Sequence, residues 1–337
     1  MIHPLLPAIW LIVLIVGLPQ LSETVYKPSL PDIAHALRVS ESAVEYTLTI
    51  YLFGFAIGML FWGKLSDAVG RKPCVLAGLF IFILGCIGCY LSTSINMLML
   101  SRVVQAFGGS IGSVLGQAIC RDAFHGPALG KVYSSIGSSL AICPTIGPIL
   151  GSVIAESFGW PSIFLFLMVF AVSLSVLISL LLPETHHVNK DKPIAILKIA
   201  LALFNDKRVI GYGVIIASCN GIYFSYFAEG PFYLIKLLGL SQKEYGLSFV
   251  AIAACTMVGG MLSKRLHHGH GAEVIMGYGL MIILASTAVF SSFALWHSYI
   301  TELPNSVMIG ITIMAQIAIN QLLALTCRKF FREVIWD

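Results

Sequence analysis

The sequence predicts an all-α protein that crosses a membrane many times, and two observations lead to this fold class. Hydrophobic residues make up 58% of the 337 residues, and charged residues make up only 11%. In a soluble domain about a quarter of the residues are charged, so the composition excludes a soluble globular protein and also a disordered chain. The second observation is a series of separate apolar segments, each close to the roughly 20 residues that a helix needs to cross a bilayer.

The apolar segments follow one another along the chain and predict transmembrane helices over residues 5–24, 44–62, 73–92, 97–120, 133–155, 161–182, 209–229, 246–263, 273–295 and 304–326. The longest polar stretch follows the sixth segment and holds a short apolar run that fits a helix on the membrane surface. This pattern predicts a first bundle of six helices at 1–182, a linker at 183–208, an incomplete bundle of four helices at 209–326 and an atypical tail at 327–337.

The basic residues predict the orientation of the chain. With the N-terminus in the cytoplasm, fifteen of the 20 Lys and Arg residues fall on the cytoplasmic side, and only Lys27, Arg38, Lys236 and Lys243 fall outside. An excess of basic residues in cytoplasmic connections is the rule for helical membrane proteins. We therefore expect both termini in the cytoplasm. The first apolar segment lacks a basic stretch before it and a cleavage pattern after it, so it is expected to be a retained span.

Several function classes lack their usual sequence features. No phosphate-binding loop, zinc-protease motif or nucleophile elbow occurs, so we expect neither an ATP-driven pump nor an enzyme. The net charge of +4 is spread over many connections, which does not indicate nucleic-acid binding. Cys86 and Cys89 have the spacing of a redox motif, but they lie within a span and lack the usual surrounding fold pattern, so no redox role is expected. His267, His268 and His270 have no Cys or carboxylate nearby, so no metal site is expected.

The segment at 63–72, GKLSDAVGRK in one-letter code, predicts a charged turn between the second and third spans. Gly70 permits a positive φ, and Asp67 and Arg71 have the spacing of an ion pair on one helix face. Asp67 is expected near the start of the third span, where the helix dipole favours a negative charge. A simple basic loop that sets topology accounts for the lysines but not for the glycines or Asp67. The candidate residues are Gly63, Asp67, Gly70, Arg71 and Lys72.

Polar residues within spans are costly in a bilayer and are therefore candidates for function. Arg102 lies in the fourth span, where it either faces a partner or a water-filled cavity, or reaches outward to the membrane surface. Gln105, one turn further on, favours the first alternative. Glu23 and Glu229 lie near span ends and are candidate proton sites, because a carboxylate in apolar surroundings takes up a proton more readily. A solvated side chain is equally consistent with the position of Glu23.

The fifth span contains a cluster of small residues and prolines. Gly147 and Gly151 lie four residues apart and predict a flat face for close helix packing. Pro144 and Pro148 loosen the helix backbone between them, and Gly137 begins the cluster. Packing alone accounts for most of this pattern.

Three segments together resemble the motifs of a known family. The segment 63–72 resembles the signature of the major facilitator superfamily. The segment 100–109, LSRVVQAFGG, is similar to the family's R-x-x-Q-G segment, with Ala106 in place of the usual glycine. The segment 137–151 resembles the G-P-x-x-G motif of proton-coupled drug antiporters. Further resemblance to the bicyclomycin-resistance (Bcr/CflA) efflux group lies at 26–31, 121–122, 183–185 and 230–232.

The resemblance implies a two-bundle transporter of the bacterial inner membrane that exports drugs or small amphiphilic molecules by alternating access. It implies a proton gradient as the energy source with no cofactor, and a monomer whose partners are protons, a small-molecule substrate and the lipid bilayer. The segment 63–72 is then the conformational switch, and the fifth-span residues form the antiporter motif. Arg102, Gln105, Glu23 and Glu229 contribute to the cavity and to proton coupling, although the group commonly has Asp where this chain has Glu23.

A transporter of this kind has two bundles of six spans, whereas this sequence offers ten. We expect the two C-terminal helices, about 60 residues with their connections, to be missing, together with the eleventh-span partner of the segment 63–72. Two alternatives stay open: a non-functional truncated remnant, and a facilitator that imports a small metabolite. The fifth-span pattern argues against import.

Overall fold

The structure is a computed structural model of the chain. It describes residues 6–185, apart from some side chains between 126 and 145, together with 210–211, 213–214, 228, 230–237, 239–247, 249–250, 281 and 285. The chain divides into two compact units. Unit 1 consists of Met1–Lys190 and Leu240–Phe249, and unit 2 consists of Asp191–Gly239 and Val250–Asp337.

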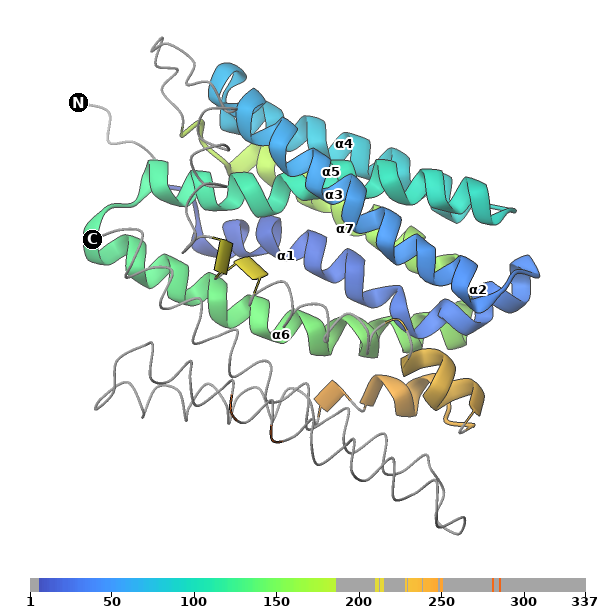
Figure 1. The fold of residues 1–337 in the computed structure, drawn as a ribbon. Coiled ribbons are helices and arrows are strands. Elements are labelled where there is room, and N and C mark those ends of the chain that lie inside the picture. Colours follow the sequence, from blue (N-terminus) through green and yellow to red (C-terminus); the bar gives the residue numbers. More distant parts are fainter. Residues whose placement is uncertain are drawn as a thin grey trace. The chain divides into compact units, whose positions relative to one another are not determined.

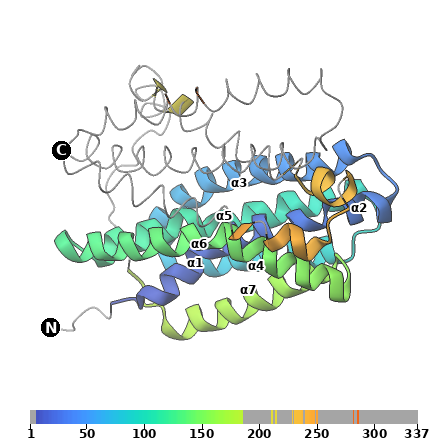
Figure 2. The same ribbon diagram turned by 90° about the horizontal axis from the view of Figure 1, so that it is seen from below.

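Unit 1 is a bundle of long helices, and the described residues contain no strand. The elements are α1 (Ile9–Val25), the short 3-10 helix η1 (Lys27–Ser29), α2 (Leu30–Leu37), α3 (Glu41–Val69), α4 (Arg71–Tyr90), α5 (Ile95–Ala123), α6 (Gly126–Phe158) and α7 (Ser162–Leu181). Figure 1 and Figure 2 show these helices running side by side. The predicted all-α fold class is thereby confirmed for the described residues, and the first six predicted spans correspond to α1 and α3–α7.

By length and composition, five helical segments among the described residues are suited to cross a membrane, with α1 to α2 counted as one. In unit 2 the structure describes one short π-helix, η2 (Phe232–Leu237). The number of spans after α7 and the predicted boundaries at 183–208, 209–326 and 327–337 stay predictions.

Local sequence signals explain where the helices begin and end. Ser40 caps α3 and Ser94 caps α5, each accepting a hydrogen bond from the backbone N–H three residues on, as serine commonly does at this position. The end of α3 differs from the prediction. The helix continues to Val69, and only Gly70, at φ +109°, separates it from α4. The predicted turn at 63–72 is therefore mostly helical, because the segment contains no helix breaker before Gly70.

Small residues allow α5 to lie at the centre of unit 1, where it packs against α1, α3 and α4. Gly108 lies against the backbone of α4 at Gly78 and Phe82, and Gly112 lies against the carbonyl of Ile15 in α1. A side chain at either glycine would overlap the neighbouring backbone, so these helices approach more closely than larger residues would allow. The outer helices complete the bundle, with α6 against α1 and α7 against α4.

Residues 240–249 belong to unit 1 although the linker separates them from it in sequence. Gln242 donates a hydrogen bond to Asp32 of α2, and Lys243 Nζ lies 3.3 Å from Glu156 Oε1 of α6. Tyr245 is fully buried. Within this segment, hydrogen bonds from the backbone N–H and the hydroxyl of Ser241 lower the pKa of the exposed Glu244.

Candidate functional site

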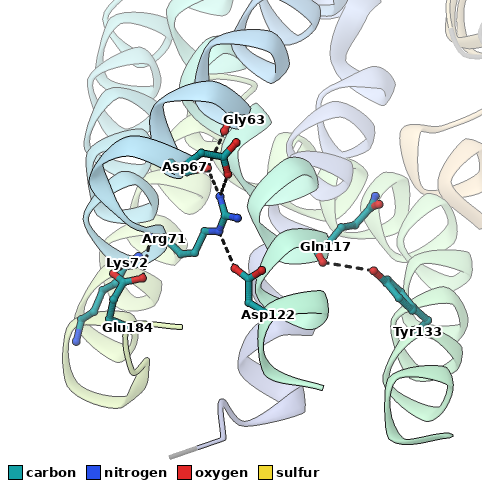
Figure 3. Close-up of polar contacts among 9 residues, drawn as sticks. Gly63, Asp67, Arg71, Lys72, Gln117, Asp122, Tyr133 and Glu184 are labelled. Atoms are coloured by element: carbon teal, nitrogen blue, oxygen red, sulfur yellow. Dashed lines mark hydrogen bonds and ion pairs between the residues drawn. The ribbon is translucent and has the colours of Figure 1, made fainter. Parts of the chain in front are cut away.

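Arg71 connects three helices at the end of the bundle where α3 meets α4 (Figure 3). Its Nε donates to Asp122 Oδ2 of α5 at 2.8 Å, and its Nη1 donates to Asp67 Oδ1 at 2.6 Å and to Ser66 Oγ at 2.7 Å, both on α3. The predicted pairing of Asp67 with Arg71 is confirmed. With Glu184, described below, these residues form what we call the Arg71 cluster: Ser66, Asp67, Arg71, Asp122 and Glu184.

The two ion pairs of Arg71 differ in their exposure to solvent. The side chain of Asp67 is 66% exposed and that of Asp122 is 24% exposed, whereas the Arg71 side chain is 9% exposed. Exposed ion pairs contribute little to stability because water screens them. The pair with Asp122 is therefore the stronger of the two, and it joins two helices that are distant in sequence.

Glu184 caps the start of α4. Its Oε1 accepts a hydrogen bond from the backbone N–H of Arg71 at 2.9 Å, and its Oε2 accepts one from the N–H of Lys72 at 3.0 Å. The carboxylate thereby satisfies backbone donors that Gly70 cannot cap, at the positive end of the helix dipole. The prediction gave this role to Asp67, which instead lies in the last turn of α3. Lys72 Nζ adds a bond of 2.9 Å to the Ser179 carbonyl of α7.

Sequence reasoning missed Asp122 and Glu184 as site residues. Both are acidic residues directly after long apolar segments, and both lie in the segments 121–122 and 183–185 that resemble the efflux group. The available signal was the acidity of both residues, since the segment 63–72 carries basic residues with which they could pair. Gly63, which was predicted to lie in a turn, lies within α3, and its carbonyl accepts a hydrogen bond of 3.0 Å from Ser66 Oγ.

Arg102 lies in the interior of unit 1, where its side chain is fully buried. This excludes the alternative in which it reaches the membrane surface. Its Nη1 donates to Gln105 Oε1 at 2.5 Å, and Gln105 Nε2 lies 3.1 Å from Cys86 Sγ on α4. Arg102 and Gln105 are therefore hydrogen-bonded to each other on α5, one turn apart.

Aromatic rings surround the guanidinium of Arg102. The distance from Cζ is 4.0 Å to the centre of the Tyr51 ring, 4.6 Å to that of Tyr26 and 6.0 Å to that of Phe164. These rings attract the cation through their negative faces. The Nε and Nη2 atoms of Arg102 have no hydrogen-bond acceptor among the described residues.

Glu23 forms an ion pair with Lys27 at the end of α1, with 2.8 Å between Oε1 and Nζ. The side chain of Lys27 is fully buried and that of Glu23 is 13% exposed. Lys27 was predicted to lie in an external connection, which stays a prediction; the structure adds that its side chain is buried within unit 1. The chain continues from α1 directly into η1 and α2, so residues 24–30 are all buried. The spacing of four residues between the two charges was the signal that the prediction overlooked.

The glycines of the fifth span pack against α1. Side chains at Gly147 and Gly151 would overlap Thr24 and the carbonyl of Val25, which confirms the predicted packing face and identifies its partner. Pro148 is buried, and α6 is one helix throughout. Gly137 and Pro144 lie within α6, but their surroundings lie outside the described residues, as do Glu229 and the histidines at 267–270.

Comparison with known proteins agrees with this architecture. The sequence model of the Major Facilitator Superfamily matches residues 12–333. An uncharacterized transporter of Rickettsia felis is 35% identical over 288 residues, which cover 84% of this chain and 70% of that protein. A bicyclomycin resistance protein homolog of Haemophilus influenzae is 31% identical over 268 residues, covering 79% of this chain and 67% of that protein.

Among solved structures, the fold is similar to a bacterial homolog of the human lysosomal transporter Spinster in its inward-facing, unoccupied conformation. The TM-score is 0.72 at 16% identity, covering 94% of this chain and 73% of the other. At this identity the likeness shows the fold alone, whereas the family match extends over nearly the whole sequence. The chain belongs to the major facilitator superfamily and is a multi-pass membrane transporter.

Proposed function

We propose that this transporter exports drugs or small amphiphilic molecules in exchange for protons. The observation that carries the proposal is the set of charged side chains in the apolar bundle: Arg102, which is bonded to Gln105, and Glu23, which is paired with Lys27. Charges at such positions are expensive and typically mark the path of an ion or substrate. The bicyclomycin resistance protein homolog among the relatives supports export as the direction.

In this mechanism Glu23 is the proton acceptor on α1. As a carboxylate it neutralises the buried Lys27, and a proton on Glu23 removes that negative charge and weakens the ion pair. Glu229 is the proposed second proton site. The proton gradient across the bacterial inner membrane supplies the energy without a cofactor, and the monomer, with both termini in the cytoplasm, is the working unit.

The Arg71 cluster is the proposed conformational switch, together with Gly63, Gly70 and Lys72. Arg71 holds the ends of α3, α4 and α5 together through bonds to two carboxylates. Transporters of this kind alternate access by rocking bundles around a fixed site, and such a movement changes how the helix ends meet. The described contacts of the cluster lie within unit 1.

Proton exchange can be measured in everted membrane vesicles from bacteria that express the chain. Respiration acidifies the vesicle interior, and a pH-sensitive acridine dye reports the gradient. Adding bicyclomycin should release protons from vesicles that contain the chain and not from control vesicles. Glu23→Gln should abolish the release, because the amide cannot carry a proton, whereas Glu41→Gln, in the first turn of α3, should leave it unchanged.

The direction of transport is tested in whole cells with labelled bicyclomycin. Expression of the chain should lower accumulation, and dissipating the proton gradient should restore it. Higher accumulation on expression would show import and reject the proposal. Proton release that is the same with and without the chain would reject exchange.

A further inference from the structure

The guanidinium of Arg102 presents an unused pair of donors. A planar guanidinium has one edge formed by Nε–H and an N–H of Nη2, and these two donors point in parallel. Gln105 binds Nη1, which is not part of this edge. Neither Nε nor Nη2 has an acceptor among the described residues, although both atoms are buried. A carboxylate or phosphate group fits such an edge with two parallel hydrogen bonds.

The charge around Arg102 favours an anion. Arg102 and Lys27 are fully buried cations, close enough to repel one another. Among the described residues, the carboxylate near these two cations is that of Glu23, which is paired with Lys27. The formal charge of the three residues is therefore positive by one unit. A buried charge without a counter-charge is costly, and an anionic group on the free edge of Arg102 removes that cost.

The surroundings of the edge are suited to an amphiphile. The rings of Tyr51 and Tyr26 lie 4.0 Å and 4.6 Å from Cζ, and Phe164 lies beyond them. These rings offer apolar and aromatic surface directly beside the charge. A small-molecule site typically combines such a lining with a few polar groups that fix orientation. Tyr26 is itself fixed by a hydrogen bond of 2.8 Å between its hydroxyl and Thr47 Oγ1.

We infer that Arg102 binds the oxyanion of an amphiphilic substrate through Nε and Nη2, so that the transporter prefers anionic aromatic compounds to neutral or cationic ones. This inference rests on the proposed transport function and specifies its substrate class. Gln105 holds the guanidinium in place, and Lys27 adds to the positive potential. A resident carboxylate of the chain on the same edge is the competing possibility, and it predicts no preference for anionic ligands.

Binding of matched probes tests this inference. The purified full chain is placed in nanodiscs of phosphatidylcholine, which has no net charge and so adds no anionic lipid. Tritiated naphthaleneacetate is the probe, at a pH where its carboxylate is ionised. Unlabelled naphthaleneacetamide is the neutral competitor and naphthylmethylammonium the cationic competitor, while acetate tests whether an oxyanion suffices without the ring. The wild-type chain should bind the carboxylate at least about tenfold more tightly than the other three.

Three variants locate the preference. Arg102→Gln should bind naphthaleneacetate and the amide equally. Arg102→Lys keeps the charge but lacks the parallel donors, so it should lose most of the preference. Lys243→Met removes a lysine from the ion pair with Glu156 and should retain the full preference. Binding of the neutral amide by Arg102→Gln shows that this variant is folded.

Three results would overturn the inference. The wild-type chain could bind the three naphthalene compounds with equal affinity, it could fail to bind the carboxylate, or the Arg102→Gln variant could keep the preference. Because binding is measured without a gradient, a chain that binds naphthaleneacetate but releases no protons when this compound replaces bicyclomycin in the vesicle assay would reject proton-coupled export alone.

Discussion

At the scale of single residues, Arg71 shows how one side chain can join distant parts of a chain. Its guanidinium donates to two carboxylates from α3 and α5 and to a serine hydroxyl. A lysine has one ammonium group on a flexible stem and cannot reach several acceptors in this fixed geometry. The identity of arginine at this position therefore matters as much as its charge.

Arg71→Lys is expected to lower the free energy of unfolding by about 2 kcal/mol, since a hydrogen bond to a charged group contributes about 1.5–3 kcal/mol and Asp67 is too exposed to add much. Thermal unfolding of the purified protein can be followed with a thiol-reactive dye, because Cys74, Cys86, Cys89 and Cys120 are buried and free. Arg121→Lys, at an exposed position next to Asp122, is the control. Equal melting temperatures for both variants would contradict the role of Arg71.

The pair of Glu23 and Lys27 gives a second prediction at this scale. Glu23→Gln leaves the buried Lys27 without its counter-charge, so this variant should lose about 3–5 kcal/mol of stability. Replacing both residues, as Glu23→Gln with Lys27→Met, removes the unpaired charge and should recover most of the loss. The melting curves of the wild type, the two single variants and the double variant form a double-mutant cycle, which isolates the interaction energy of the pair. Additive losses would show that the two side chains do not interact.

At the scale of helices, α4 depends on a cap from another part of the chain. Gly70 has a positive φ that suits the sharp bend between α3 and α4, but it has no side chain with which to cap α4. The carboxylate of Glu184 replaces that missing cap. A Cβ at position 70 would lie 3.0 Å from Glu184 Oε2, so glycine is needed both for the backbone conformation and for the approach of the cap.

Glu184→Ala is expected to destabilise the start of α4 by about 1 kcal/mol, the usual value of a helix cap. Glu184→Gln should cost less, because its amide oxygen can still accept one of the two hydrogen bonds. Hydrogen exchange of the backbone N–H groups of Arg71 and Lys72, measured by mass spectrometry on peptides from this region, should be faster in Glu184→Ala than in the wild type. Unchanged exchange would exclude Glu184 as the cap.

The contact of α6 with α1 leads to a prediction about Gly151 in the segment 137–151. Gly151→Ala would place a methyl group onto the carbonyl of Val25, so the two helices must separate, at a cost of about 1–3 kcal/mol. Gly213→Ala is a suitable control, because open space surrounds this glycine. A loss of transport by Gly151→Ala without a lower melting temperature would indicate that the motif acts on movement and not on packing.

At the scale of the whole molecule, the sequence predicted the fold class and most of the first six helices, because apolar length is a strong and local signal. It also predicted the pair of Asp67 with Arg71 from their spacing of four residues, and it noted Gln105 one turn after Arg102 on the same helix. Glu184 was missed because its partners lie more than 100 residues away in sequence. The burial of Lys27 was not predicted, because a lysine after an apolar segment usually marks the membrane surface, whereas here it is buried beside Glu23.

The docking of residues 240–249 onto unit 1 leads to a prediction for the transport cycle. In this structure Lys243 lies beside Glu156, and Gly246 lies against Ser152. If alternating access requires this segment to leave α6, a covalent bond between them should stop transport. The double variant Glu156→Cys with Lys243→Cys, treated with a short, cleavable thiol-specific crosslinker, is expected to lose transport activity and to regain it when the crosslinker is cleaved.

The single variants with the same treatment serve as controls for the eight native cysteines, of which Cys74, Cys86, Cys89 and Cys120 are buried. Crosslinking without loss of transport would show that the segment and α6 move as one body throughout the cycle. The opening would then have to occur elsewhere between the bundles. Loss of transport on crosslinking would instead show that the contact between Lys243 and Glu156 breaks and reforms in each cycle. Such a contact can break easily, because an ion pair between two exposed side chains is weakened by water and salt.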